Sequence, residues 1–477
     1  MDWKLVYAWL GICALVEGTA LLLPVLCAWN YGEDLSASFA ALSALSFGLG
    51  GLLLHKGEGH RQRVDLREAS TIMVLLWPSL ALLGFLPFWA TGWLGPMDAF
   101  LEAMSDITAV SIAILPNGAP YALKFWQALL MWMGSLNFLA ILVTVLPQVS
   151  GCFGMELSAL RGQGFSPMMR RMKSMAKKTA IVYAALTFFS FLLFLVAGLA
   201  PWDACSMAMR CISTGGGEFF PGKGNFLVER AIMASTLLGS LRIILYWQAA
   251  TRTDFRAFWR DSEVRVFLFL TLAAGFIVAL HLHATHQYNW YQSLHYGFFH
   301  MLSFLGTTGF RAAAVEYWPD FDIFFLLLLS FVGGCMGSAT GGLKIIRLLV
   351  LFKMTWAGVR RTLHPHMTTS IKVSGAPVPT KVAARILSFF FLYILVFFSS
   401  AVVLSMSGEN LSSSVGMSLA CLTGIGFAPG LCGPAEFMAL PAPMKLFACL
   451  VMEAGRIEIF AILAMMQSSW RDMRRKW

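Results

Sequence analysis

Long apolar stretches recur along the whole chain of 477 residues. A helix that crosses a bilayer needs about 20 mostly apolar residues, and ten stretches approach or exceed that length. They are residues 5–29, 36–54, 69–97, 125–155, 179–202, 231–251, 266–280, 323–343, 386–408 and 446–470. The pattern predicts an all-α integral membrane protein with ten spans.

Basic residues are distributed unevenly among the connections between these stretches. Of the 35 lysines and arginines, 27 are Lys4 itself or lie in the tail after Trp470 or in every second connection. Those connections are 55–68, 150–178, 252–265 and 344–385. Cytoplasmic loops carry such an excess of positive charge, so we expect both chain ends on the cytoplasmic side.

Four of the connections on the opposite side are long, at 98–124, 203–230, 281–322 and 409–445. Each contains an apolar or small-residue stretch of about 10–14 residues, which suits a re-entrant segment better than a span. Each then reaches a cluster of glycine, serine and threonine. This repetition predicts four span, pore-loop, span units in a pseudo-fourfold arrangement, preceded by an N-terminal two-helix hairpin.

The expected divisions follow from this repeat. They are a hairpin at 1–68, then pore repeats at 69–178, 179–265, 266–385 and 386–477, of which the third has a broken second span.

The four small-residue clusters are candidates for an ion filter. Non-helical backbone at membrane depth is tolerated only where it is buried in protein or lines a watery cavity, and backbone carbonyls can replace the hydration shell of an alkali ion. The candidate filter residues are Thr108, Ser111, Ile212, Ser213, Thr214, Gly215, Thr307, Thr308, Gly309, Thr423, Gly424, Ile425 and Gly426. We expect the backbone of Ser111, Gly215, Gly309 and Gly426 to hold one monovalent cation. The alternative is that each cluster is an ordinary turn between helices.

Composition supports transport over other classes of function. Hydrophobic residues make up 58% of the chain and charged residues 13%, whereas a soluble domain carries about 25% charge. The net charge of +10 therefore indicates how the chain is oriented in the membrane, and we expect no nucleic-acid partner. The spans lack the paired acidic and histidine residues of a membrane enzyme, so we expect no enzyme activity.

Five motifs resemble one family. They are 66–68 (LRE), 98–103 (DAFLEA), 307–310 (TTGF), 333–344 (GGCMGSATGGLK) and 455–460 (GRIEIF). The chain resembles the Trk/Ktr/HKT superfamily of potassium transporters, specifically the Trk-type membrane subunit with its additional N-terminal hairpin. The resemblance implies channel-like uptake of potassium across a bacterial-type inner membrane. It also implies a homodimer and a cytosolic nucleotide-binding ring subunit as regulatory partner.

No cofactor is expected in this chain itself, and nucleotide is expected only through the partner. The run 217–223 (GEFFPGK) spells a phosphate-binding loop, but Gly224 replaces the serine or threonine that would hold magnesium, and no strand precedes it. The basic loops 161–178 and 344–385 could dock the ring subunit or anionic membrane lipids.

The glycine-rich run in the eighth span has two interpretations. Gly333, Gly337 and Gly341 could form a ridge for helix packing. The resemblance instead favours a broken helix that blocks the inner pore, and Arg456 supports this because a charge deep in a span needs partners in the bundle interior. The candidate gate residues are Gly333, Gly334, Gly337, Ser338, Ala339, Thr340, Gly341, Gly342, Lys344, Arg456 and Glu458.

The sequence departs from the family at the filter. The first cluster ends in Ser111 where the family normally has glycine, and members with serine there are often sodium-permeable. The transported ion is therefore expected to be potassium or, in view of Ser111, also sodium. Asp106, Arg210 and Arg242 are further unusual charges. A secondary symporter coupled to sodium or protons, with the same pore, is the alternative function.

Overall fold

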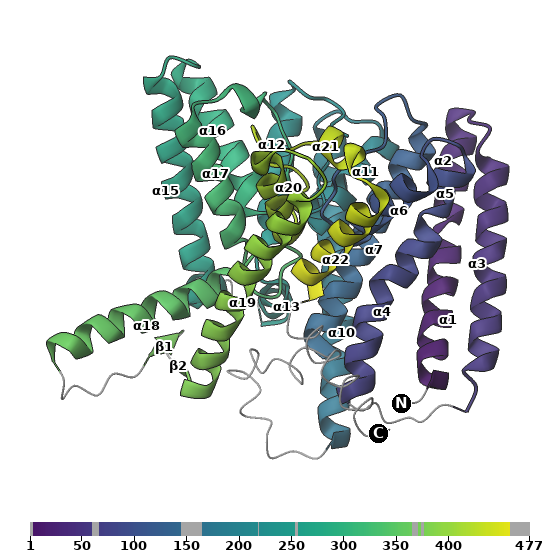
Figure 1. The fold of residues 1–477 in the computed structure, drawn as a ribbon, viewed down its shortest axis with the longest axis horizontal. Helices are drawn as coiled ribbons and strands as arrows, with labels where there is room; N and C mark the ends of the chain where they lie inside the picture. The colour runs from purple at the N-terminus through teal and green to yellow at the C-terminus, as the bar shows by residue number, and fades with distance from the viewer. Residues whose placement is uncertain are drawn as a thin grey trace.

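The fold begins with a helical hairpin at one side of the bundle (Figure 1). The structure, a computed structural model, describes residues 3–59, 66–144, 165–217, 219–252, 256–364, 371–373 and 376–457. Helices α1 (Trp3–Ala20) and α2 (Leu22–Tyr31) together reach membrane length and return through α3 (Ser36–Lys56). Gly11 and Gly50 let α1 and α3 approach closely, because a Cβ on Gly11 would lie 3.0 Å from the Gly50 carbonyl oxygen.

Four repeats of helix, short pore helix and helix follow the hairpin. Repeat 1 comprises α4 (Leu66–Gly84), α5 (Leu86–Ala90), α6 (Pro96–Ile107) and α7 (Tyr121–Thr144). Repeat 2 comprises α10 (Phe165–Val196), α11 (Pro201–Ser213), α12 (Phe226–Ser240), α13 (Ile243–Arg252) and α14 (Arg256–Arg260). Repeat 3 comprises α15 (Ser262–Ala284), α16 (Trp290–Leu305), the 3₁₀ turn η2 (Val315–Tyr317), α17 (Asp320–Val332) and α18 (Ile345–Leu363). Repeat 4 comprises α19 (Thr380–Ser405), α20 (Leu411–Thr423), α21 (Pro434–Ala439) and α22 (Ala442–Ile457).

This architecture confirms the predicted fold class. The predicted divisions at 68/69, 265/266 and 385/386 fall near the starts of α4, α15 and α19, and the division at 178/179 falls near the middle of α10.

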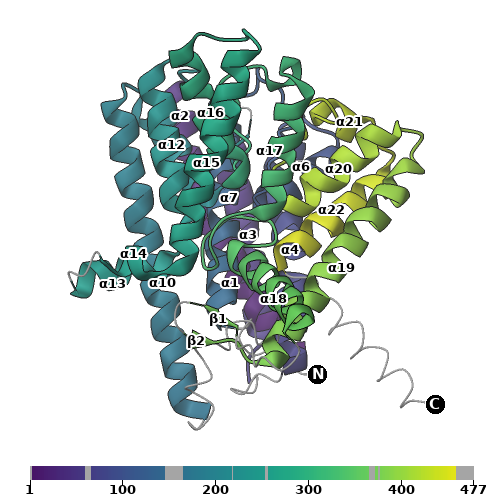
Figure 2. The same cartoon turned by 90° about the vertical axis from the view of Figure 1, so that its left-hand side faces the viewer.

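The pore helices α6, α11, α16 and α20 are short because strong start and stop signals flank them. Proline occupies the first turn of α6 and α11, where its missing N–H costs nothing. Asn289 caps α16 by accepting a hydrogen bond from the Gln292 N–H at 3.0 Å. All four lie in the half of the molecule opposite the N-terminus (Figures 1 and 2), and the residues at their C-terminal ends are buried.

Several of the ten expected spans are not continuous helices. Among the described residues, six helices are long and apolar enough to cross a membrane. The second span of repeat 2 breaks at Leu241, between α12 and α13, and that of repeat 3 breaks between α17 and α18. The described part of α22 ends at Ile457. Length and composition alone could not separate a broken span from a continuous one.

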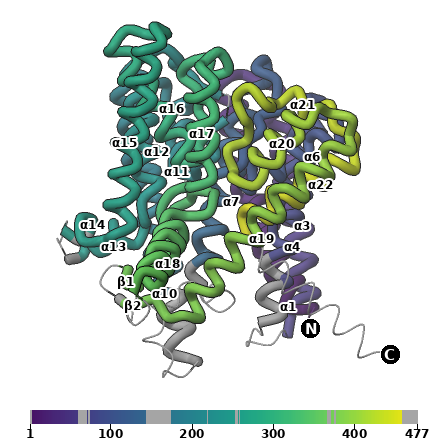
Figure 3. Tube along the Cα trace, turned by 60° about the vertical axis from the view of Figure 1, so that its left-hand side comes forward, coloured from purple at the N-terminus to yellow at the C-terminus, as the bar shows by residue number. Residues whose placement is uncertain are grey.

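The segment 344–385, expected to be a loop, contains regular structure. Helix α18 has 19 residues, and it projects sideways from the end of the bundle where the N-terminus lies (Figures 1 and 3). A two-stranded antiparallel pair, β1 (Lys372–Val373) and β2 (Ala376–Pro377), follows it. Val350, Val373 and Ile386 form a small buried cluster beneath α18, which anchors the helix to the start of α19.

Candidate functional site

The ends of the four pore helices share one hydrogen-bond pattern. In each, a carbonyl oxygen near the C-terminus accepts N–H groups from residues five or six positions later. In repeat 1 the Ser105 carbonyl oxygen accepts from Val110 N at 2.9 Å and from Ser111 N at 3.2 Å, and in repeat 2 the Arg210 carbonyl accepts from Gly215 N at 3.1 Å and Gly216 N at 3.4 Å. In repeat 3 the Ser303 carbonyl accepts from Thr308 N at 2.8 Å and Gly309 N at 3.4 Å. In repeat 4 the Ala420 carbonyl accepts from Gly426 N at 3.5 Å. The four segments after the helices, 108–111, 213–216, 306–309 and 423–426, are therefore structural equivalents.

The same segments share their left-handed residues. Four positions after the accepting residue, φ is 55° at Ala109, 59° at Thr214, 52° at Thr307 and 82° at Gly424. Six positions after it, φ is 58° at Ser111, 56° at Gly216, 70° at Gly309 and 79° at Gly426. Alternating left-handed residues turn successive carbonyls to one side, and non-glycine residues adopt this conformation only at a cost.

The equivalence identifies Gly216 as the counterpart of Ser111, Gly309 and Gly426. The predicted anchor Gly215 lies one residue earlier and corresponds to Val110, Thr308 and Ile425.

The four segments meet in a closed ring. A Cβ on Gly216 would overlap the Thr308 carbonyl oxygen of the third segment, and a Cβ on Gly309 would lie 2.5 Å from the Ile425 carbonyl oxygen of the fourth. A Cβ on Gly426 would overlap the Ser111 and Val110 carbonyl oxygens of the first. Each glycine is thus needed where its backbone contacts the next segment. The structure brings the four predicted clusters together.

Ser111 is the one member of the ring that carries a side chain at this position. Its hydroxyl lies against Gly217, where a Cβ would be 2.6 Å from Ser111 Oγ. Gly217 has φ +99° and follows two other glycines. The second segment therefore provides the space that the serine in the first segment requires.

Several predicted filter hydroxyls hydrogen-bond to their own pore helices. Thr108 Oγ1 donates to the Met104 carbonyl at 2.7 Å, Thr423 Oγ1 to Leu419 at 2.8 Å, and Ser213 Oγ to Arg210 at 3.1 Å. These three side chains stabilise the helix ends. Ile212 packs in the hydrophobic core.

The entrance to the ring is a depression of about 220 Å³ lined by residues from all four segments or their continuations. The lining residues are Ser111, Ile112, Gly217, Gly309, Arg311, Phe427 and Pro434. Arg311 pairs with Glu316 at 2.5 Å and stacks over the Phe427 ring with its guanidinium carbon 4.5 Å from the centroid. One positive charge at the mouth is thereby held against an acidic and an aromatic partner.

The glycine-rich run lies on the other side of the ring. Helix α17 ends at Val332, and Gly333, Gly337 and Gly342 have φ values of 70°, 86° and 74°. A helix cannot continue through such residues, so the interpretation as a continuous packing ridge is wrong. Gly334 N donates to Thr340 Oγ1 at 3.1 Å, and Ser338 and Thr340 share a hydrogen bond of 2.8 Å, which folds the run into a compact loop. We call residues 333–342 the inner loop.

The inner loop contacts three of the four segments that follow the pore helices. Thr214 Oγ1 donates to the Ala339 carbonyl at 3.0 Å, and Gly341 N donates to Thr307 Oγ1 at 2.9 Å. A Cβ on Gly341 would overlap the Thr423 carbonyl oxygen. Gly341 is therefore required for the loop to reach the fourth segment.

Two buried basic side chains hold the inner loop. Arg456 Nη1 donates to the Ala339 carbonyl at 2.7 Å, and its Nη2 donates to Ser135 Oγ at 2.6 Å. Ser135 Oγ in turn donates to the Ser213 carbonyl at 2.8 Å. Lys344 Nζ donates to the carbonyl and, at 2.9 Å, to the hydroxyl of Thr340. Glu458, the remaining predicted gate residue, lies outside the described residues.

Sequence reasoning missed Glu263, which binds the backbone within the inner loop and just after it. Its Oε1 accepts from Met336 N at 2.6 Å and from Ile346 N at 3.3 Å. Glu263 was assigned to a basic connecting loop, but Asp261 caps helix α15 at Glu263 N and places the glutamate in its first turn. Asp261, shortly before an apolar stretch and with Glu263 in the first turn, was an available signal for that helix start. Arg242, whose role was open, pairs with Asp261 at 3.4 Å.

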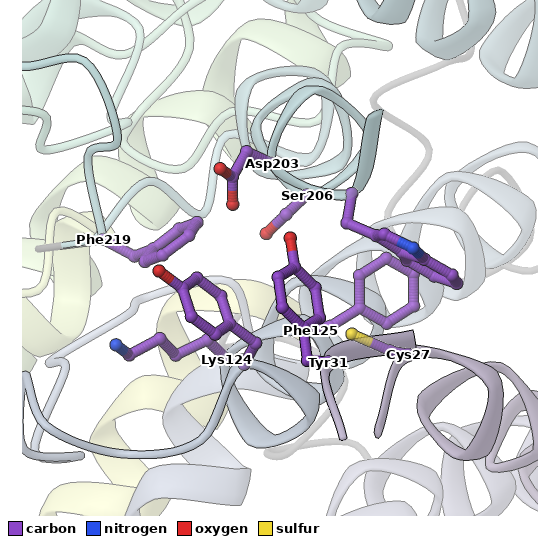
Figure 4. Close-up of a pocket in the computed structure, with 9 residues that line it drawn as sticks. Cys27, Tyr31, Lys124, Phe125, Asp203, Ser206 and Phe219 are labelled. Carbon is purple, nitrogen blue, oxygen red and sulfur yellow. The ribbon is translucent and has the colours of Figure 1, made fainter. Parts of the chain in front are cut away.

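A second cavity, of about 190 Å³, lies between the hairpin and repeats 1 and 2. Figure 4 shows Asp203 and Ser206 facing it from α11, Tyr31 and Cys27 from the hairpin, and Phe219 from the loop after the second filter segment. It is separate from the ring. No cluster of three or more His, Cys, Asp or Glu side chains suited to a metal ion occurs in the described part of the chain.

Known proteins match nearly the whole chain. Curated relatives include the Trk system potassium uptake protein TrkH of Halomonas elongata, 27% identical over 99% of this chain and 100% of the relative, and TrkG of Escherichia coli, 26% identical over 97% of both. The crystal structure of the potassium transporter TrkH from Vibrio parahaemolyticus superimposes with a TM-score of 0.88 at 26% identity, covering 97% of this chain and 98% of that one.

The family comparison agrees with these relatives. The sequence model of a family described as "TrkH: Cation transport protein" matches residues 35–469, which include the four segments after the pore helices and the inner loop. Its members are named as transporters and not as enzymes. The chain belongs to the TrkH family of cation transport proteins.

Proposed function

We propose that this protein mediates channel-like uptake of potassium across the plasma membrane of a bacterial-type cell. The observation that carries the proposal is the closed ring of four equivalent segments, each with two left-handed residues, at the inner ends of four pore helices. Such a ring can replace ion hydration with backbone carbonyls. The names of the relatives, potassium uptake proteins, support potassium as the ion.

The cation site of this proposal uses the backbone of Ser111, Gly216, Gly309 and Gly426, with Gly216 in place of Gly215. The pore helices support it further, because their C-terminal ends carry partial negative charge toward the ring. The inner loop, held by Arg456 and Lys344, acts as a gate in series with this filter. A symporter coupled to sodium or protons would share the pore but require a second gradient.

Uptake of radioactive rubidium into proteoliposomes tests the proposal. Rubidium accumulation driven by a potassium gradient alone is expected. Accumulation that requires an imposed proton or sodium gradient would instead support the symporter.

Replacing Ser111 with glycine should raise the preference for potassium over sodium. Ser111 occupies a left-handed position that costs an L-residue roughly 1–2 kcal/mol, and glycine would remove that strain and let the first segment match the third and fourth. Competition of sodium against rubidium uptake measures the change. An unchanged ratio in the folded variant would count against the role of this segment in selectivity. Ser388→Gly is the control, because Ser388 is exposed on α19 and its hydroxyl donates to the Ala384 carbonyl, away from the ring.

We further propose a cytosolic ring subunit with a nucleotide-binding fold as partner, and a homodimer in the membrane. Both termini are then cytoplasmic. Support comes from the basic character of α18, which carries Arg360 and Arg361 in its last turn and projects from the bundle (Figure 1). Purified ring subunit should bind the wild-type protein in a nucleotide-sensitive manner and bind Arg360→Glu/Arg361→Glu more weakly. Binding to anionic vesicles alone, without any ring association, would show that these charges serve the lipid surface.

A further inference from the structure

Arg210 occupies a position that its counterparts give to small side chains. The equivalent residues of the other pore helices are Ser105, Ser303 and Ala420, each of which accepts the N–H groups of its filter segment. The two serines also contact their own segments, since Ser105 Oγ accepts from Ile112 N at 2.7 Å and Ser303 Oγ donates to the Phe310 carbonyl at 2.9 Å. Repeat 2 replaces these local contacts with a charged side chain that reaches further.

Arg210 holds the second filter segment from both sides. Its carbonyl accepts from Gly215 N and Gly216 N at 3.1 and 3.4 Å, while its Nη1 donates to the Gly216 carbonyl at 2.9 Å. The side chain is 1% exposed. A charge-assisted hydrogen bond in such surroundings is strong, so the Gly216 carbonyl has a fixed direction.

The guanidinium also connects the second segment to the first. Arg210 Nη2 donates to Gln127 Oε1 and to the Lys124 carbonyl, both at 3.0 Å. Gln127 Nε2 donates to Glu102 Oε1, and Glu102 Oε2 accepts from Ile114 N at 2.8 Å. An unbroken series of hydrogen bonds thus runs from the Gly216 carbonyl to the backbone that leaves the first segment.

Two carboxyl groups on α6 lie near the Arg210 guanidinium. Glu102 and Asp106 lie one turn apart and are both fully buried. Both interact electrostatically with Arg210. A buried guanidinium without such partners would be costly, which explains why an arginine can occupy this position behind a cation filter.

We propose that Arg210, Gln127 and Glu102 form a bracket that fixes the first and second filter segments relative to each other and thereby determines the ion selectivity of this protein. Arg210 is a positioning residue in this account. The proposal rests on the proposed function of the ring as an ion filter. Selectivity depends on the number and placement of coordinating carbonyls, so loosening the bracket lets the ring adapt to the smaller sodium ion.

The test compares Arg210→Lys with Asp98→Asn. Lysine keeps the charge but cannot reproduce the planar fork that reaches three acceptors. Asp98→Asn weakens the ion pair with Lys445 at the start of the same pore helix that carries Glu102, without touching the bracket. The readouts are the ratio of rubidium to sodium uptake per folded molecule in proteoliposomes and the thermal stability of the purified protein.

We expect Arg210→Lys to lower the ratio about 10-fold, equivalent to about 1.4 kcal/mol, and Asp98→Asn to leave it unchanged. Gln127→Met should also lower the ratio, by a smaller factor. This variant tests the proposal if Arg210→Lys does not fold. A wild-type ratio in folded Arg210→Lys, or in Gln127→Met when only that variant folds, would overturn the bracket while leaving the filter in place. Absence of rubidium uptake by the unmodified protein would overturn the proposed function and this proposal together.

Discussion

Replacing Arg456 with alanine should raise ion flux through the folded protein. Its charged hydrogen bond to the Ala339 carbonyl and its bond to Ser135 Oγ hold the inner loop against the ring. Losing a hydrogen bond to a charged group costs about 1.5–3 kcal/mol. If that energy is lost only from the closed state, the closed-to-open equilibrium shifts by about 10-fold to 150-fold.

Rubidium uptake per folded molecule measures this change, and Lys445→Met is the matched control. Lys445 lies on the same helix as Arg456 but pairs with Asp98, away from the inner loop. Deleting residues 337–340 should raise flux in the same way, because the plug is shortened while the filter remains. Unchanged or reduced flux in both variants, at normal thermal stability, would contradict the gate.

Replacing Gly426 with alanine should reduce rubidium uptake by about 100-fold or more. Its Cβ would overlap the carbonyl oxygens of Ser111 and Val110, so the fourth segment must move away from the first. Overpacking costs about 1–3 kcal/mol and a left-handed L-residue adds about 1–2 kcal/mol. The displaced carbonyls then no longer surround one site, and this geometric loss falls on transport more than on folding.

Gly424→Ala separates the effect of the contact between segments from the effect of backbone strain. Gly424 is also left-handed, with φ 82°. A Cβ there would lie 3.8 Å from the Gly341 Cα, an ordinary van der Waals contact. Its equivalent in the first segment, Ala109, already carries alanine at φ 55°. Gly424→Ala should therefore retain most uptake. Equal loss in both variants would show that backbone strain, and not the contact between segments, is responsible.

The fourfold architecture could be predicted because it depends on features that are local in sequence. Span length, short apolar pore segments and small-residue clusters recur at similar intervals, and the bilayer permits few folds for such a pattern. The break after Val332 was likewise signalled by the glycine-rich run and by Arg456, a charge that needed an interior partner. Both features follow from the cost of polar groups in an apolar medium.

The register of the second filter segment could not be predicted from the sequence. Residues 215–217 are all glycine, so residue type does not distinguish which of them matches Ser111. The contact of Gly216 with Thr308 decides it, and that contact joins residues 92 positions apart in the chain. The roles of Glu263 and Arg210 were hidden for the same reason, since Met336 lies 73 positions from Glu263 and Gln127 lies 83 positions from Arg210.

Rubidium uptake by purified protein in proteoliposomes, with a potassium gradient as the sole driving force, tests the central claim most directly. Wild-type protein should accumulate rubidium without any proton or sodium gradient, and Gly426→Ala should abolish that accumulation while Gly424→Ala preserves it. Accumulation that appears only with an imposed proton or sodium gradient, or that persists unchanged in Gly426→Ala, would contradict a channel-like pathway through the ring of four segments.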